Sequence, residues 1–130
     1  MSLPASSPAL LGIGDNVVDF YKDRGEFFPG GNALNVPVLA KRYGLARAGY
    51  IGLVGNDAEG AHVRAALESE GLWIGRLRQA VGPNGKAVVA LDADGDRVFL
   101  GSNKGGIQRA LSLRMDDEDL AAIRDFGNVH

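Results

Sequence analysis

Residues 29–44 of the chain read PGGNALNVPVLAKRYG, a pattern that predicts a glycine-rich turn running directly into a helix. Paired glycines allow a ligand to approach the backbone closely, because no Cβ atom stands in the way. The helix that follows directs its free N–H groups and the positive end of its dipole back at the turn. Asn32 and Asn35 add amide groups that both donate and accept hydrogen bonds. The stretch therefore suits a polyhydroxylated ligand or an anion, although an ordinary loop with an asparagine cap shares the pattern.

The apolar residues of this stretch predict which face of the helix is buried. Proline is tolerated in the first turn, so Pro37 predicts that the helix begins near residues 33–36. Gly44 is expected just past the last turn. The residues expected on the buried face recur at helical spacing and are Val36, Leu39, Ala40 and Tyr43.

The residues on either side predict an α/β fold with a parallel sheet. Residues 9–14 form a short apolar run ended by glycine, which is typical of a buried parallel strand. Residues 48–54 form a second such run, and Asp57 is the expected N-cap of a helix that ends near Glu70. An order of strand, helix, strand, helix predicts a parallel sheet flanked by helices.

The pattern changes after residue 85. Two apolar runs, residues 86–91 and 97–100, are joined by Asp-Ala-Asp-Gly-Asp, which predicts an antiparallel hairpin standing off the main sheet. A helix with an acidic first turn is expected after Met115, and residues 128–130 resemble the approach to another strand. The residues expected on the buried face of that helix are Leu120, Ile123 and Phe126.

Composition excludes several classes of function. The 130 residues suffice for one domain with a sizeable core. A net charge of -2 argues against a dedicated nucleic-acid partner. The chain has no cysteine, and its only histidines are His62 and His130, so neither a disulfide framework nor a metal site is expected.

No apolar run reaches the ~18 residues of a membrane span, so no membrane partner is expected. Residues 1–8 lack a basic region and a long apolar stretch. They predict a flexible tail rather than a signal peptide, which makes the cytoplasm the expected location.

The segment Gly12-Ile13-Gly14-Asp15-Asn16-Val17 partly matches a dinucleotide-binding turn. Val17 stands in place of the third glycine, and Asp15 would set a negative charge beside the pyrophosphate. A dinucleotide-binding oxidoreductase domain therefore remains only a remote alternative. A Walker-type phosphate loop is excluded, because no glycine-lysine-Ser/Thr triplet occurs.

Five short motifs follow one another along the chain: GDNVVD (14–19), GGNALN (30–35), YG (43–44), VGNDAEG (54–60) and DRV (96–98). In this order they resemble the PfkB-type, ribokinase-like carbohydrate kinases, most closely the fructoselysine 6-kinases among them. The resemblance runs from about Leu11 to His130. It implies a Rossmann-type α/β/α core, here the N-terminal half of the domain over residues 9–130, with a small β-sheet lid over the sugar.

The lid segments implied by the resemblance are about residues 17–28 and 86–100. Lids of this kind pair between subunits, so an exposed sheet edge could form a homodimer.

The resemblance also implies a sugar site. Asp19 matches the aspartate that binds sugar hydroxyls, and it lies beyond the carboxyl end of the first strand, where ligands of such sheets bind. Gly30 and Gly31 match the pair on which the sugar packs, and Asn35 matches a helix asparagine that contacts it. Asn32 stands where relatives differ with their substrates.

Three further residues complete the expected substrate-binding set. Asp15 and Asn16 directly follow the first strand and lie near the entrance to the same sugar site, which we call the mouth. Arg97 lies on the lid, where it could reach an acidic or hydroxyl group or simply remain a solvated charge. For Asp57 and Gly60, turn and cap chemistry is the better explanation.

Relatives of this family run to roughly twice this length. Their second half carries a Gly-Ala-Gly-Asp-like motif with the catalytic base and the anion hole, and the ATP pocket lies nearby. The resemblance therefore implies ATP-dependent phosphoryl transfer to a sugar hydroxyl in full-length relatives, with Mg as the companion ion. It predicts a sugar-binding N-terminal portion of a fructosamine- or ketose-type kinase, with no catalytic residue and no tight ATP or Mg binding of its own. A truncated, non-catalytic binding or dimerisation module is the alternative.

Overall fold

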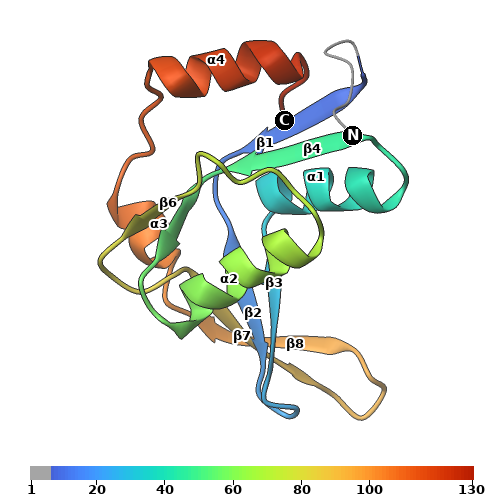
Figure 1. Ribbon diagram of the computed structural model, residues 1–130. Helices are drawn as coiled ribbons and strands as arrows, with labels where there is room; N and C mark the ends of the chain where they lie inside the picture. Colours follow the sequence, from blue (N-terminus) through green and yellow to red (C-terminus); the bar gives the residue numbers. More distant parts are fainter. Residues whose placement is uncertain (1–6) are drawn as a thin grey trace.

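The computed structural model describes residues 7–130, which form three small sheets and four helices (Figure 1). The tail predicted at residues 1–8 falls mostly outside this range. The strands are β1 (Ala9–Ile13), β2 (Val17–Tyr21), β3 (Glu26–Gly30), β4 (Arg47–Ile51), β5 (Leu53–Gly55), β6 (Arg78–Ala80), β7 (Lys86–Leu91) and β8 (Arg97–Ser102). The helices are α1 (Asn32–Arg42), α2 (Ala58–Ser69), α3 (Gly106–Ala110) and α4 (Asp117–Phe126).

The core is a parallel arrangement around β1, as the sequence predicts. β1 pairs with β4, with Ala9 opposite Arg47 and Ile13 opposite Ile51. On the other edge of β1, the His130 N–H donates to the Leu11 carbonyl at 2.9 Å. Residues 128–130 therefore approach the sheet as a further parallel strand, which confirms the prediction made for them.

Two apolar clusters cover the two faces of this core. On one face α1 and α2 pack through residues such as Leu34 and Leu67 against the buried Tyr50. On the other face Phe126 of α4 packs against Leu11 and Ile51. Helices α1 and α2 thus lie on one side of the small sheet and α4 on the other, which is the expected α/β/α arrangement (Figure 1).

The second predicted strand is interrupted at Gly52. The sequence predicts one strand over residues 48–54, whereas the structure has β4 and β5 with Gly52 between them. A Cβ atom at Gly52 would lie 2.1 Å from the Tyr50 hydroxyl. The Tyr50 side chain thus fills the space at this break, and only glycine fits beside it.

The buried face predicted for α1 is wrong. Leu39 is 47% exposed and Tyr43 is 88% exposed, while Leu34 and Val38 face the core. The helix begins at Asn32, one residue before the expected range, and Pro37 lies in its second turn. Gly12 allows this, because a Cβ atom there would lie 2.7 Å from the Pro37 Cγ. The close approach of Pro37 to β1 turns the other apolar stripe of the helix inward.

A four-stranded sheet, which we call the second sheet, extends away from the core in the order β3-β2-β7-β8 (Figure 1). β2 pairs antiparallel with β3 and parallel with β7, and β7 pairs antiparallel with β8. The pairing of β7 with β8 confirms the hairpin predicted from the Asp-Gly turn. Both segments predicted to form a lid, residues 17–28 and 86–100, belong to this sheet.

The ends of α2 follow the predicted cap chemistry. The Asp57 carboxylate accepts from the Gly60 N–H at 2.9 Å, and Gly71 has a φ of 75° just after the helix. A Cβ atom at Gly60 would lie 1.9 Å from the Gly55 carbonyl oxygen, so this position requires glycine. No helix of residues 7–130 has the length and apolar character that crossing a bilayer requires.

The acidic helix α4 is attached through a buried carboxylate that the sequence analysis did not identify. Asp119 is fully buried and accepts from the Arg76 Nε at 2.9 Å and from the Arg78 guanidinium. Its side chain also closes a capping box with Asp116 at the start of the helix. Because Asp119 is drawn inward, Leu120 is left 40% exposed, so its predicted burial is wrong.

Candidate functional site

The diglycine turn presses against the chain that leaves β1. β3 ends at Gly30, and Gly31 is the N-cap of α1 with a φ of 101°. A Cβ atom at Gly31 would lie 3.0 Å from both the Asn16 Cα and the Asp15 carbonyl oxygen. A side chain is therefore excluded at Gly31, and the turn and residues 15–17 meet backbone to backbone.

Asp19 lies beside this turn. It is on β2, opposite Phe28 of β3, and Val17 of the same strand is opposite Gly30. Residues two apart on a strand share a face, so Asp19 and Val17 lie on one side of the second sheet. The Asp19 Oδ2 would lie 3.7 Å from a Cβ atom at Gly30. The structure therefore brings Asp19, Gly30 and Gly31 together, as the sequence analysis expects.

Arg97 reaches the same carboxylate from β8. Its guanidinium lies 3.2 Å from the Asp19 Oδ2 and 5.9 Å from the centre of the Tyr21 ring. The Asp19 side chain is 23% exposed and the Arg97 side chain 56% exposed. Arg97 thus contacts Asp19 directly, and solvent reaches both groups.

Asn32 and Asn35 occupy the first turn of α1, and both are exposed. Asn35 lines a cavity of about 370 Å³ between β3, α1 and α2, together with Phe28 and the ion-paired Arg42 and Glu70. Asp19 is not among the described residues that line this cavity. Asn35 therefore faces the cavity beside α1 and α2, whereas Asp19 lies on a face of the second sheet.

Asn16 is almost completely buried, and its amide is fully hydrogen-bonded. Its Nδ2 donates to the Tyr50 hydroxyl at 3.1 Å and to the Leu53 carbonyl at 2.9 Å. Its Oδ1 accepts from Asn84 at 3.2 Å and from Gln108 at 2.9 Å. The side chain of Asn16 thus holds the mouth together and has no hydrogen-bonding capacity left for a ligand.

Asn84 connects the same mouth to α2. It is 1% exposed, its Oδ1 accepts from the Gly55 N–H at 3.1 Å, and its own N–H donates to Asp57 at 3.0 Å. Neither Asn84 nor Gln108 is predicted from the sequence. Their partners lie far away in the sequence, so no local pattern distinguishes them from other amides.

Tyr50 completes this buried network. Burial raises the pKa of its phenol far above the ordinary value, so the hydroxyl stays protonated. It donates to the Gly14 carbonyl while accepting from Asn16. The end of β1 is thus fixed by buried polar groups on both sides of residue 15.

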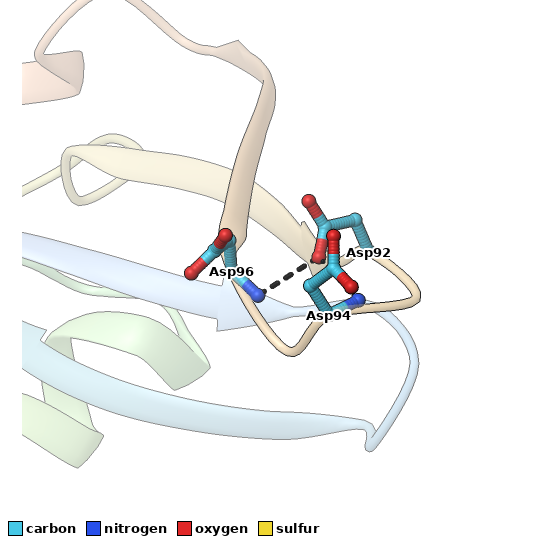
Figure 2. Close-up of side chains that lie close together, drawn as sticks. All are labelled: Asp92, Asp94 and Asp96. Atoms are coloured by element: carbon cyan, nitrogen blue, oxygen red, sulfur yellow. Dashed lines mark hydrogen bonds between the residues drawn. The ribbon is translucent and has the colours of Figure 1, made fainter.

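Three carboxylates gather at the tip of the β7–β8 hairpin: Asp92, Asp94 and Asp96 (Figure 2). Their oxygens lie within 4.8 Å of one another, and all three residues are exposed. The Asp92 Oδ1 accepts from the N–H groups of Asp94 and Asp96, each at 2.9 Å. These turn hydrogen bonds account for the proximity of the three residues, and no metal site is assigned to them.

The dinucleotide alternative is wrong. That motif requires a helix immediately after the glycine turn, so that the pyrophosphate meets the helix N-terminus. Here residues 17–21 form β2 and run into the second sheet. The first helix begins only at Asn32.

Comparison of the sequence with known families and proteins supports the predicted relationship. A family model described as pfkB family carbohydrate kinase matches residues 9–130. Fructosamine kinase FrlD of Bacillus subtilis (strain 168) is 50% identical over 121 residues, which cover 93% of this chain and 42% of that protein. Fructoselysine 6-kinase of Escherichia coli (strain K12) is 36% identical over 121 residues, covering 93% and 44%. The chain thus spans less than half the length of these relatives.

Among solved structures, ribokinase of Arabidopsis thaliana complexed with ribose and ATP matches with a TM-score of 0.75. The match covers 95% of this chain and 44% of that chain at 24% sequence identity. At this identity the likeness concerns the fold. It confirms that residues 7–130 form a partial ribokinase-like α/β fold.

Proposed function

Because the chain belongs to the pfkB family of carbohydrate kinases, we propose that it supplies the acceptor-binding part of a kinase for fructosamine-type sugars. The reaction would transfer a phosphoryl group from ATP to a sugar hydroxyl. The observation that carries the proposal is the contact of Asp19 with the diglycine turn at the mouth beyond β1. The names of the relatives, fructosamine kinase and fructoselysine 6-kinase, support the choice of acceptor.

In this proposal each group at the mouth has a part suited to a neutral, hydroxyl-rich ring. The Asp19 carboxylate accepts hydrogen bonds from sugar hydroxyls, and the ion pair with Arg97 orients that carboxylate. The ring packs on Gly30 and Gly31, where no side chain intervenes. Asn32 and Asn35 offer amides from the first turn of α1 to the hydroxyl groups of the sugar. Asp15 lies at the same mouth, and Asn16 acts by holding it in place.

Asp19 is not part of the cluster of three carboxylates found among the described residues. The one cluster of three carboxylates in residues 7–130 lies at the exposed hairpin tip. ATP, when bound, supplies the phosphoryl group. We propose that the groups holding ATP and Mg²⁺, the catalytic base and the anion hole belong to the part of the family outside these 130 residues. The described residues then bind the acceptor and cover it with the second sheet.

A titration of this chain with fructoselysine, followed by backbone NMR, tests the proposal. We expect shifts to concentrate at residues 15–19 and at the diglycine turn, with weak affinity because only part of the pocket is present. We also expect no measurable phosphoryl transfer when ATP and Mg²⁺ are added. Shifts elsewhere, or none at all, would contradict acceptor binding. Robust turnover would contradict the assignment of catalysis to other parts of the family.

A second candidate function, assembly through the second sheet, is favoured by the exposed apolar side chains of β8. Phe99 is 66% exposed and Leu100 52% exposed, and β8 is an edge strand. Unpaired edges of this kind attract another chain. Sedimentation over a concentration series should then show a dimer that Phe99→Ser weakens, with Leu111→Ser, an exposed change outside the sheet, as the control. A monomer at all concentrations would exclude this function.

A further inference from the structure

A cavity of about 510 Å³ opens where the second sheet meets the end of β1. It is distinct from the cavity that Asn35 lines. Three segments contribute to it: the turn between β1 and β2, the adjoining ends of β7 and β8, and α3 with its preceding loop. The lining residues that matter here are Asp15, Val17, Lys86, Ser102, Lys104 and Arg109.

The charges in this cavity are only partly compensated. Lys86 pairs with Glu59 at 3.2 Å. Lys104 and Arg109 are exposed, and neither forms an ion pair with any residue of the described range 7–130. Asp15 is likewise exposed and forms no ion pair within that range. The cavity therefore presents two free cations and one free carboxylate, a combination that complements a zwitterion.

The cavity adjoins the proposed sugar site. Val17 lines it, lies opposite Gly30, and shares a face of β2 with Asp19. Asp19 pairs with Ala87 of β7, and Ala87 pairs with Ser102 of β8, which also lines the cavity. Neighbouring strands lie about 4.8 Å apart, so the backbones at Asp19 and Ser102 are roughly 10 Å apart. A ligand that reaches both places needs a flexible arm between its two ends.

Resting on the proposed function, we propose that this cavity holds the amino-acid head of a fructosamine acceptor. The sugar lies at Asp19 and the diglycine turn, and the linking side chain crosses the second sheet. The α-carboxylate pairs with Lys104 and Arg109, and the α-ammonium pairs with Asp15. The cavity thus selects sugars conjugated to a free amino acid over unmodified ketoses.

Three ligands distinguish binding of the sugar from binding of the amino-acid head. They are D-fructose, fructoselysine, and fructoselysine with its carboxyl group converted to the carboxamide. The wild-type chain is expected to bind fructoselysine about tenfold more tightly than the carboxamide, which is close to the lower end of the contribution of a hydrogen bond to a charged group. The double variant Lys104→Asn/Arg109→Ala should bind both compounds alike, at the carboxamide level. Asparagine is chosen at position 104 because Lys104 has a φ of 58°, which asparagine tolerates.

Measuring wild type and double variant with both fructoselysine and its carboxamide gives a double cycle, which makes the test specific. If the cations bind the carboxylate, removing either partner removes the same increment, so the two changes are not additive. The affinity for D-fructose should stay unchanged in the double variant. Arg124→Ala is the matched control, because it removes a cation from α4, at the opposite end of the molecule from the second sheet (Figure 1). This control should retain the full preference for fructoselysine.

Other results would overturn the inference. Equal wild-type binding of fructoselysine and its carboxamide would overturn this inference alone, provided that D-fructose still binds. Binding of none of the three would overturn the proposed function as well. Inorganic phosphate is the remaining probe: if phosphate binds through Lys104 and Arg109 while the carboxamide loses nothing, the cavity is a phosphate site instead.

Discussion

Replacing Asp19 with alanine is expected to weaken fructoselysine binding by about thirtyfold, which corresponds to roughly 2 kcal/mol for a lost carboxylate acceptor. The Asp19 side chain lies against the diglycine turn, with its Oδ2 3.7 Å from the position of a Cβ atom at Gly30. Its ion pair with Arg97 is partly exposed, so its loss should change stability by less than about 1 kcal/mol. The variant therefore stays folded, and isothermal titration measures binding alone.

The matched control for this experiment is Asp94→Ala. It removes a carboxylate from the exposed tip of the β7–β8 hairpin (Figure 2), which belongs to the same second sheet. Its affinity for fructoselysine should equal that of the wild type. An Asp19→Ala chain that binds the sugar normally would rule out Asp19 as an acceptor ligand, and with it the proposed orientation of the sugar.

Replacing Asp119 with asparagine is expected to lower the free energy of unfolding by about 3 kcal/mol, at the low end of the range for breaking a buried ion pair. The low end applies because the Arg76 and Arg78 side chains remain about a quarter exposed. The amide has one acceptor oxygen where the carboxylate has two, so the guanidinium groups lose their buried charge partner. Denaturant unfolding measures the change. Asp117 is an exposed acid in the same first turn, so Asp117→Asn should change the free energy of unfolding by less than about 1 kcal/mol.

The pH dependence of this difference follows from the charge of Asp119. Burial by itself raises the pKa of Asp119, but the Asp116 N–H and the two guanidinium groups outweigh burial and hold the pKa below its usual range. A depressed carboxyl pKa stabilises the fold above the unfolded value of 3.8 and loses this effect as the pH falls through the folded pKa. The gap between wild type and Asp119→Asn should therefore be full at neutral pH and shrink below about pH 4. A gap independent of pH would mean that packing, and not charge, anchors α4.

The elements that the sequence predicts correctly are those specified by local chemistry. β1 is a continuous apolar run, the β7–β8 turn is an Asp-Gly hairpin, and α2 has an aspartate cap and a terminal glycine. Each of these signals lies within a few residues, so the rest of the chain is not needed to interpret it. The proximity of Asp19 to the diglycine turn was predicted differently, from the resemblance of the ordered motifs to the carbohydrate kinase family.

The errors arise where distant segments decide the outcome. α1 carries two apolar stripes, and the packing of Pro37 on Gly12 selects the one that local spacing did not favour. In the sequence Asp119 is one acid among several. Its burial depends on ion pairs with Arg76 and Arg78, which lie far away along the chain. Asn84 and Gln108 are important only because β1, α2 and the second sheet meet there. The short elements β6 and α3 have too few residues to produce a periodic pattern.

The buried amides of Asn16 and Asn84 also have a consequence for how the molecule meets its ligand. They join the core to the base of the second sheet through bonds that water does not reach. Tilting that sheet as a whole would break several of these bonds at once, so its resting angle is set before any sugar arrives. The ligand then enters a preorganised mouth, and little of its binding energy is consumed in ordering the protein around it.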